Sequence, residues 1–173
     1  SDWSSDVCSS DLTVAEKERD IISEFDPEKD YCLYVGIPFC PTRCLYCSFA
    51  AYPIYEYESK VDDFIESLKK ELELIAFLNR NRRLAAIYMG GGTPTSLSAD
   101  QLKSVMDCID NYFDKSQMVE CTVEAGRPDS ISEEKLAVIK AHGIGRISVN
   151  PQTMNDKTLS LIGRAHTSED IIR

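Results

Sequence analysis

Extended apolar segments alternate four times with amphipathic or capped helical segments along this chain, and this order constrains its fold more than any other feature. A helix between successive strands returns the chain to the same end of a sheet, so the strands are expected to lie parallel. The sequence therefore predicts an α/β fold built on a parallel sheet. The predicted strands are residues 31–37, 84–89, 118–124 and 146–149, and the predicted helices are residues 58–79, 98–113, 130–143 and 155–162.

Local patterns give further detail on these elements. Residues 31–37 are almost continuously apolar, which is typical of a strand buried on both faces of a sheet. Capping-box sequences begin at Ser98 and at Ser130, and Gly143 is a good left-handed helix end. The first predicted helix carries an apolar stripe at helical spacing, which consists of Val61, Phe64, Ile65, Leu68, Leu72, Ile75 and Ala76.

A length of 173 residues and a hydrophobic content of 43% suffice for one domain with a sizeable core. No apolar run approaches the ~20 residues of a membrane span. Residues 1–12 show no structural period, and residues 2–12 resemble the conceptual translation of a sequencing-library adapter. A disordered tail is the alternative, so Trp3 and Cys8 are given no role. We expect a connector at residues 13–30 and, at residues 31–173, the N-terminal part of a core domain that is truncated at its C-terminus.

Charge and cysteine content exclude some partners. The formal net charge of −10 argues against nucleic acid, because such binding needs clustered lysine and arginine. Seven cysteines would suit a disulfide framework, but no secretory signal pattern is present and three of them share one loop, so we predict a reduced, cytoplasmic setting. Cys32, Cys108 and Cys121 fall in apolar segments and are predicted to be buried thiols without chemistry.

Cys40, Cys44 and Cys47 follow the first predicted strand with the spacing C-x3-C-x2-C. Three thiolates on one loop can converge on one metal centre, and both zinc and iron–sulfur clusters take thiolate ligands. A structural zinc site usually finds its fourth ligand nearby, whereas the next cysteine here is Cys108. The spacing therefore favours an iron–sulfur cluster with one iron left free, and a zinc site or three buried thiols are the alternatives.

Further candidate residues follow the other predicted strands. The run from Gly90 to Gly92 follows the second strand, Glu124 ends the third, and Gln152 lies just beyond the fourth. The C-terminal ends of parallel strands meet at one edge, which carries the working residues of α/β barrels. Glycines at such an edge allow a ligand to approach the backbone closely and leave N–H groups free to donate.

Three sequence motifs carry a family resemblance: Tyr34-x-x-Ile37-Pro38-Phe39-Cys40, the run from Gly90 to Thr95, and the run from Arg146 to Gln152. With the cysteine spacing, they resemble the radical S-adenosylmethionine (SAM) superfamily, and within it the oxygen-independent coproporphyrinogen III dehydrogenase (oxidase) family, from about Tyr31 to the last residue. The resemblance implies a partial parallel (β/α) barrel, of which about four of six βα units are present here.

The same resemblance implies a cofactor site. Cys40, Cys44 and Cys47 would hold a 4Fe-4S cluster whose free iron takes S-adenosyl-L-methionine, which is cleaved to a 5′-deoxyadenosyl radical. Taken alone, Tyr34 would be a core aromatic, Tyr46 would serve in packing and Arg164 would be exposed to solvent. The resemblance implies that Gln152 and Arg164 contact a second molecule of the cofactor. The full set of residues implied to contact the cofactor is Tyr34, Tyr46, Gly91, Gly92, Thr93, Glu124, Gln152 and Arg164.

The family's reaction is the oxidative decarboxylation of coproporphyrinogen III propionates to vinyl groups in haem biosynthesis, with an electron donor such as a flavodoxin or ferredoxin. Phe49 stands where the best-known members carry a further cysteine, and Cys47-Ser48-Phe49 resembles a branch that also contains haem-trafficking proteins. The run from Glu124 to Asp129 favours the dehydrogenase type. A haem chaperone and a radical enzyme with another substrate remain the alternatives, and the chain alone is not expected to be active.

Overall fold

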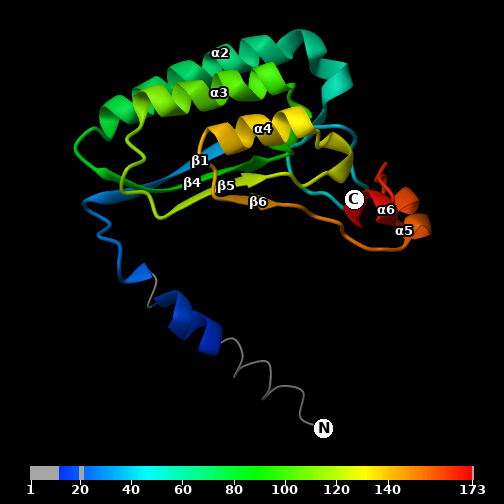
Figure 1. Cartoon of the computed structure of the whole chain (residues 1–173), viewed down its shortest axis with the longest axis horizontal. Helices are drawn as coiled ribbons and strands as arrows, with labels where there is room; N and C mark the ends of the chain where they lie inside the picture. The colour runs from blue at the N-terminus through cyan, green and yellow to red at the C-terminus, as the bar shows by residue number, and fades with distance from the viewer. Residues whose placement is uncertain (1–11, 20–21, 173) are drawn as a thin grey trace.

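The computed structural model describes residues 12–19 and 22–172, and it shows one parallel sheet with helices across one of its faces (Figure 1). The strand order is β1-β4-β5-β6, and every neighbouring pair is parallel. The predicted α/β fold with four strand–helix units is therefore confirmed. The sheet consists of β1 (Asp30–Ile37), β4 (Arg83–Gly91), β5 (Glu120–Glu124) and β6 (Arg146–Ser148), and the helices are α2 (Ile54–Leu78), α3 (Ala99–Tyr112), α4 (Glu133–Ala141), α5 (Asp156–Leu161) and α6 (Ser168–Ile172).

The N-terminal segment is described only in part. Residues 1–11, with Trp3 and Cys8, lie outside the described residues, so the interpretation of this stretch stays a prediction. Residues 12–19 are helical, and β1 begins at Asp30. In the described part of the chain, no helix combines the length and apolar character that a membrane crossing requires.

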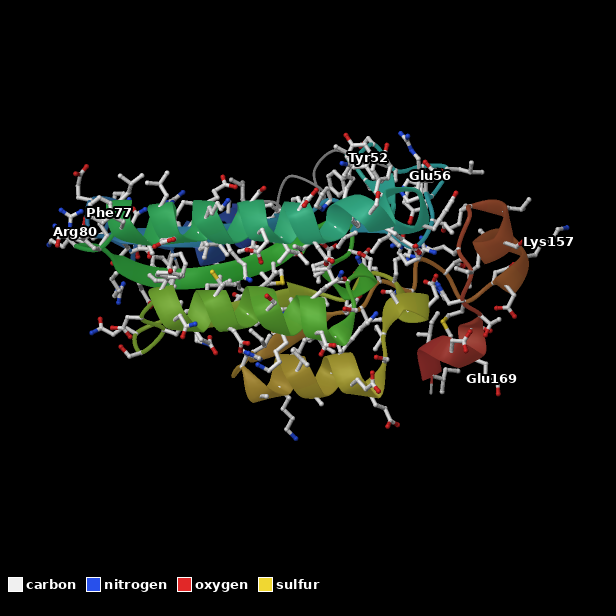
Figure 2. The ribbon with its side chains drawn as sticks, turned by 90° about the horizontal axis from the view of Figure 1, so that it is seen from above. Tyr52, Glu56, Phe77, Arg80, Lys157 and Glu169 are labelled. Atoms are coloured by element: carbon white, nitrogen blue, oxygen red, sulfur yellow. The ribbon has the colours of Figure 1, made fainter. Side chains whose placement is uncertain are left out.

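The core lies between the sheet and the layer formed by α2, α3 and α4, which run side by side across it (Figure 2). The predicted stripe of α2 faces this core, since its middle residues are buried against the strands. The stripe of α3 does the same, beginning with Leu102 and ending at Phe113. Burial of each such side chain stabilises the fold by roughly 1.5–3 kcal/mol. The sheet contributes Leu33, Val35, Ile37, Ile87, Met89, Cys121 and Val123.

The expectation that β1 is buried on both faces is wrong. Its burial alternates, with Leu33 and Val35 buried and Tyr34 61% exposed. Side chains along a strand point to opposite faces, and the helices cover only one face of this sheet (Figure 1). Cys32 is exposed on the same open face, so its prediction as a buried thiol is also wrong. The apolar run concealed this alternation because Cys32, Tyr34 and Gly36 count as apolar whichever way they point.

One predicted helix start is confirmed and the other is displaced. Ser98 and Gln101 form a complete capping box at α3. Ser130 does not cap α4, because it lies in the 3-10 turn η2 (Pro128–Ser130) and its hydroxyl donates to the Arg127 carbonyl. The cap of α4 is Ser132, whose hydroxyl accepts from the Lys135 backbone N–H at 3.4 Å.

The helix ends agree with the sequence. Gly143 follows α4 with φ +71°, in the left-handed region. His142 Nδ1 lies 2.7 Å from the Val138 carbonyl oxygen, so its ring contacts a carbonyl at the helix end.

An ion pair fixes the N-terminal end of the sheet and makes folding sensitive to acid. The Arg83 guanidinium binds both carboxylate oxygens of Asp30, at 2.8 and 2.7 Å, and lowers the pKa of Asp30 from 3.8 to about 2. A carboxyl group whose pKa is lower in the folded state stabilises the fold at pH values above its pKa in the unfolded state. This stabilisation is lost as the pH falls through the pKa of the folded state. We expect Asp30→Asn to lower the free energy of unfolding at pH 7, and this deficit to disappear as the pH falls from about 4 to about 2. Urea titrations across this pH range measure it, and a deficit that is constant with pH would contradict the assignment.

Candidate functional site

The cysteine loop leaves the C-terminal end of β1 and is closed at its base by a small ladder. The strands β2 (Phe39–Cys40) and β3 (Tyr52–Pro53) pair in parallel, with Cys40 opposite Pro53. The first turn of α2, which carries Glu56, lies toward α5 together with Tyr52 of β3, and Phe77 marks the opposite end of α2 (Figure 2). The loop therefore lies at the C-terminal edge of the sheet, as predicted.

The three cysteines share this loop but not one environment. Cys44 is buried, Cys40 and Cys47 are half-buried, and none of the three is in a disulfide. Burial raises the pKa of the Cys40 thiol, while the Thr93 hydroxyl at 3.6 Å and the Arg127 charge oppose that rise. Among residues 12–19 and 22–172, no three Cys, His, Asp or Glu side chains are close enough to hold a metal ion. Ligation would therefore require the three thiols to turn toward one centre.

The glycine run after β4 packs directly against the start of the cysteine loop. The backbone N–H groups of Gly92 and Thr93 donate to the carbonyls of Ile37 and Phe39, at 2.7 and 2.8 Å. A Cβ on Gly92 would lie 2.6 Å from the Phe39 oxygen and 3.1 Å from Cys40 Sγ. The absence of a side chain at Gly92 therefore keeps space open beside the Cys40 sulfur.

Gly91 is the glycine of this run that the backbone most strongly requires. Its φ is +106°, and a Cβ there would lie 2.9 Å from the Ile37 carbonyl oxygen. We expect Gly91→Ala to lower the free energy of unfolding by at least about 2 kcal/mol, because both the conformation and the contact become unfavourable. Urea denaturation measures this loss.

Gly145 provides the matched control, because in the described part of the chain no atom lies within 4 Å of a Cβ built there. Gly145→Ala is expected to change stability by less than about 0.5 kcal/mol. Equal effects of the two substitutions would contradict the role of Gly91.

The end of α5 holds the cysteine loop from the other side. The Thr42 hydroxyl donates to the Gly163 carbonyl at 2.9 Å, and the Leu45 N–H donates to the Ile162 carbonyl at 3.1 Å. Gly163 has φ +82°, and a Cβ on it would lie 3.0 Å from the Arg43 carbonyl oxygen. The backbone of residues 162–163 is therefore in direct contact with the backbone of the cysteine loop.

Glu124 ends β5 beside the glycine run. Its Oε1 accepts from Asn150 Nδ2 at 3.4 Å, and a Cβ on Gly90 would lie 3.0 Å from its Oε2. Burial raises the pKa of the Glu124 carboxyl, and hydrogen bonds from Asn150 and the Gly91 backbone partly offset this. A half-buried carboxylate of this kind is a strong acceptor for an ammonium group or a ribose hydroxyl.

Tyr34 lies on the open face of the sheet and not in the core. Its ring stacks on that of Tyr88, with centroids 6.0 Å apart and planes at 7°. The two tyrosines are opposite each other on β1 and β4, and the open face also carries Glu124 at the end of β5. The structure thus brings Tyr34 to the same face as Glu124.

The structure changes the expected surroundings of Arg164 and Tyr46. Arg164 is buried, which contradicts the solvent alternative, and its Nη1 donates to the Gly126 carbonyl at 2.7 Å. Its Nη2 donates to the Tyr46 hydroxyl at 2.9 Å, so these two predicted residues are in direct contact. Within the described residues, Arg164 Nε is buried without a hydrogen-bond partner. Nε is therefore an unpaired donor beside Tyr46 and Gly126.

Gln152 and His166 lie close to Arg164 in the chain but differ in environment. Gln152 is exposed and has φ +65°, a conformation that is uncommon for residues other than glycine. His166 is buried, and its Nε2 lies 3.3 Å from the Pro151 carbonyl oxygen. Its Nδ1 has no hydrogen-bond partner among the described residues.

Sequence reasoning missed Arg127, which is 2% exposed and contacts both Cys44 and Thr42 in the cysteine loop. A single sequence shows only that an arginine follows β5 with Asp129 two residues later, which is a weak signal for an ion pair between neighbours. Asn150, which bonds Glu124, was also missed. By contrast, Cys108 and Cys121 are buried, as predicted.

The arrangement fits an iron–sulfur cluster by the chemistry of its donors. The loop supplies three thiols, which such clusters prefer as ligands, and the buried Arg127 guanidinium would offset part of the thiolate charge. Gly92 leaves room beside Cys40, and Glu124 and Arg164 Nε offer an acceptor and a donor near the same edge. The chemistry of these residues therefore suits a soft metal centre and a polar cofactor.

Residues 34–173, which include the whole cysteine loop, match the family model of the Radical SAM superfamily. The chain therefore belongs to this superfamily. Its relatives include a coproporphyrinogen oxidase-like protein and heme chaperones. It is 44% identical over 143 residues to the oxygen-independent coproporphyrinogen-III oxidase-like protein HemZ of Bacillus subtilis, covering 81% of this chain and 28% of that protein. It is also 40% identical over 139 residues to the heme chaperone HemW of the same species, covering 80% of this chain and 36% of HemW.

A solved structure has the same fold. Coproporphyrinogen III oxidase (HemN) from Escherichia coli superposes with a TM-score of 0.72 at 28% sequence identity, covering 83% of this chain and 32% of that structure. The predicted partial barrel of radical SAM type is therefore confirmed. The chain spans about a third of the length of these relatives.

Proposed function

We propose that residues 31–173 are the N-terminal part of a radical SAM core domain that binds a 4Fe-4S cluster through Cys40, Cys44 and Cys47. The single observation that carries this proposal is the convergence of the cysteine loop, the glycine run and Glu124 on one edge of a parallel sheet. A cluster with three protein ligands has one iron free for S-adenosyl-L-methionine. When bound, the reduced cluster would supply the one electron that breaks a carbon–sulfur bond of this cofactor, which would give methionine and a 5′-deoxyadenosyl radical.

The chain's own residues bind and orient the cofactor in this proposal. The backbone around Gly91, Gly92 and Thr93 contacts the methionine part, and the Glu124 carboxylate accepts hydrogen bonds from it. The stacked rings of Tyr34 and Tyr88 cover the open face beneath, where they exclude water from the reacting atoms.

A second cofactor molecule beside Gln152, Arg164 and Tyr46 is a further proposal. Arg164 Nη1 and Nη2 already donate within the protein, so this molecule would be held by the Nε donor of Arg164.

We propose the oxidative decarboxylation of coproporphyrinogen III as the reaction of the whole protein. The 44% identity to HemZ supports it. Hydrogen removal from a propionate side chain, followed by loss of carbon dioxide and an electron, would give each vinyl group. The protein would act in the cytoplasm, because the six cysteines among its described residues are free thiols, with a flavodoxin or ferredoxin as electron donor.

A haem chaperone is the second candidate, and the 40% identity to HemW favours it. The two functions are separated by incubating the full-length protein, anaerobically reconstituted, with coproporphyrinogen III, S-adenosyl-L-methionine and a reductant. Chromatography would show protoporphyrinogen-type vinyl products if the first proposal holds. Stable haem binding without vinyl product would support the chaperone, and deoxyadenosine release with neither result would indicate another substrate.

A further inference from the structure

Arg127 is the most completely bonded side chain near the cysteine loop. Arg127 is only 2% exposed, and all five of its side-chain N–H donors have acceptors. Nε and Nη2 donate to the two carboxylate oxygens of Asp129, at 3.0 and 2.9 Å. The other donors go to the cysteine loop: Nη1 to the Thr42 carbonyl at 3.1 Å and to Cys44 Sγ at 3.5 Å, and Nη2 to the Thr42 hydroxyl at 3.0 Å.

This geometry joins two segments that no strand ladder connects. Arg127 and Asp129 belong to the turn after β5, whereas Thr42 and Cys44 lie in the irregular loop after β2. The planar fork of arginine makes parallel bonds to one carboxylate while its remaining donors reach the loop, which a lysine cannot reproduce. This guanidinium therefore ties Cys44 directly to the turn after β5, whereas Arg164 links the same turn to Tyr46 in the loop.

The charged groups around Arg127 also direct one of its N–H donors toward the Cys44 sulfur. Asp129 neutralises the guanidinium on one side, and the opposite side presents an N–H group to Cys44. Hydrogen bonds to the sulfur ligands and nearby positive charge both favour the more negative, reduced state of an iron–sulfur cluster. Removing Arg127 and removing Asp129 should therefore shift the potential of such a cluster in opposite directions.

We propose that Arg127 is a positioning residue that holds Cys44 for cluster binding and, by donating to its sulfur, raises the reduction potential of the cluster. This inference rests on the proposed cluster site at Cys40, Cys44 and Cys47. It goes further, because it assigns control of the potential to an arginine of the β5 turn, with Asp129 as the opposing charge.

The test uses Arg127→Gln, Arg127→Lys and Asp129→Asn in the full chain, each reconstituted anaerobically with iron and sulfide. Redox titration followed by electron paramagnetic resonance (EPR) measures the midpoint potential, and iron loss to a chelator measures retention. Arg127→Gln is expected to shift the potential to more negative values and to weaken retention by about ten- to a hundred-fold. Asp129→Asn is expected to shift the potential to more positive values, and Arg127→Lys to restore only part of both properties.

Arg83→Gln is the matched control, because Arg83 also binds one aspartate through two nitrogens but lies at the opposite end of β4. It should leave potential and retention unchanged. Equal potentials in Arg127→Gln, Asp129→Asn and wild type would overturn the inference, as would shifts of the same sign in both variants. If circular dichroism shows Arg127→Gln to be unfolded, the sign of the Asp129→Asn shift decides. A wild-type chain that takes up no cluster would overturn the proposed function itself, which is a distinct result.

Discussion

Substitution of Cys44 by alanine is expected to reduce the iron and sulfide bound after anaerobic reconstitution from about four of each per chain to less than one. Cys40→Ala and Cys47→Ala should do the same, because a cluster held by three protein ligands has no spare thiolate in the loop. Iron and acid-labile sulfide assays, with the visible absorption of the cluster, measure this loss. It is the largest effect that the proposed site predicts.

Cys121→Ala is the matched control for these variants. Cys121 is buried in β5 and contributes to the core, away from the loop, so its replacement should leave iron and sulfide at the wild-type level. Retention of the full cluster by any one of the three loop variants would contradict the ligand assignment. A colourless wild-type chain with one zinc per molecule would instead favour the structural zinc alternative.

The second large effect concerns cofactor binding by Glu124. Glu124→Gln is expected to weaken S-adenosyl-L-methionine binding by about ten- to a hundred-fold, because a charged hydrogen bond contributes roughly 1.5–3 kcal/mol. Calorimetric titration of the cofactor into the cluster-loaded chain measures this change. The substitution keeps the size of the side chain and one acceptor oxygen, so it tests the carboxylate charge.

Glu120→Gln controls for the loss of a negative charge on the same strand. Glu120 lies at the start of β5, where its Oε1 accepts from the Thr122 hydroxyl at 2.7 Å, and it is far along the strand from the glycine run. Its replacement should leave cofactor affinity within about two-fold of wild type, since exposed charges contribute little. If the two variants weaken binding equally, the effect arises from net charge and the role of Glu124 is wrong.

Local signals in the sequence were sufficient for the order of elements. Strand–helix alternation, the Ser98 cap and the Gly143 helix end each depend on neighbouring residues, and the structure confirms all three. The face of β1 that is covered depends instead on where three helices pack, which a single apolar run does not encode. The position of Ser130 was not predictable for a similar reason, because it depends on hydrogen bonds within the turn after β5.

In the candidate site, too, only the features that depend on neighbouring residues could be predicted from the sequence. The cysteine loop, the glycine run and Glu124 were predictable because all three follow strands that share an edge. Arg127 and the burial of Arg164 were not, because they arise from contacts across more than 80 and more than 30 residues of sequence. Such long-range hydrogen bonds leave no periodic trace in one sequence.

The central claim is that three loop thiols hold a cluster whose remaining iron binds S-adenosyl-L-methionine. Its most direct test is the EPR spectrum of the reduced, reconstituted chain recorded before and after addition of this cofactor. The account predicts a 4Fe-4S signal whose g values change when the cofactor is added, because the cofactor becomes a ligand of the free iron. A 4Fe-4S signal that is identical with and without the cofactor would contradict it.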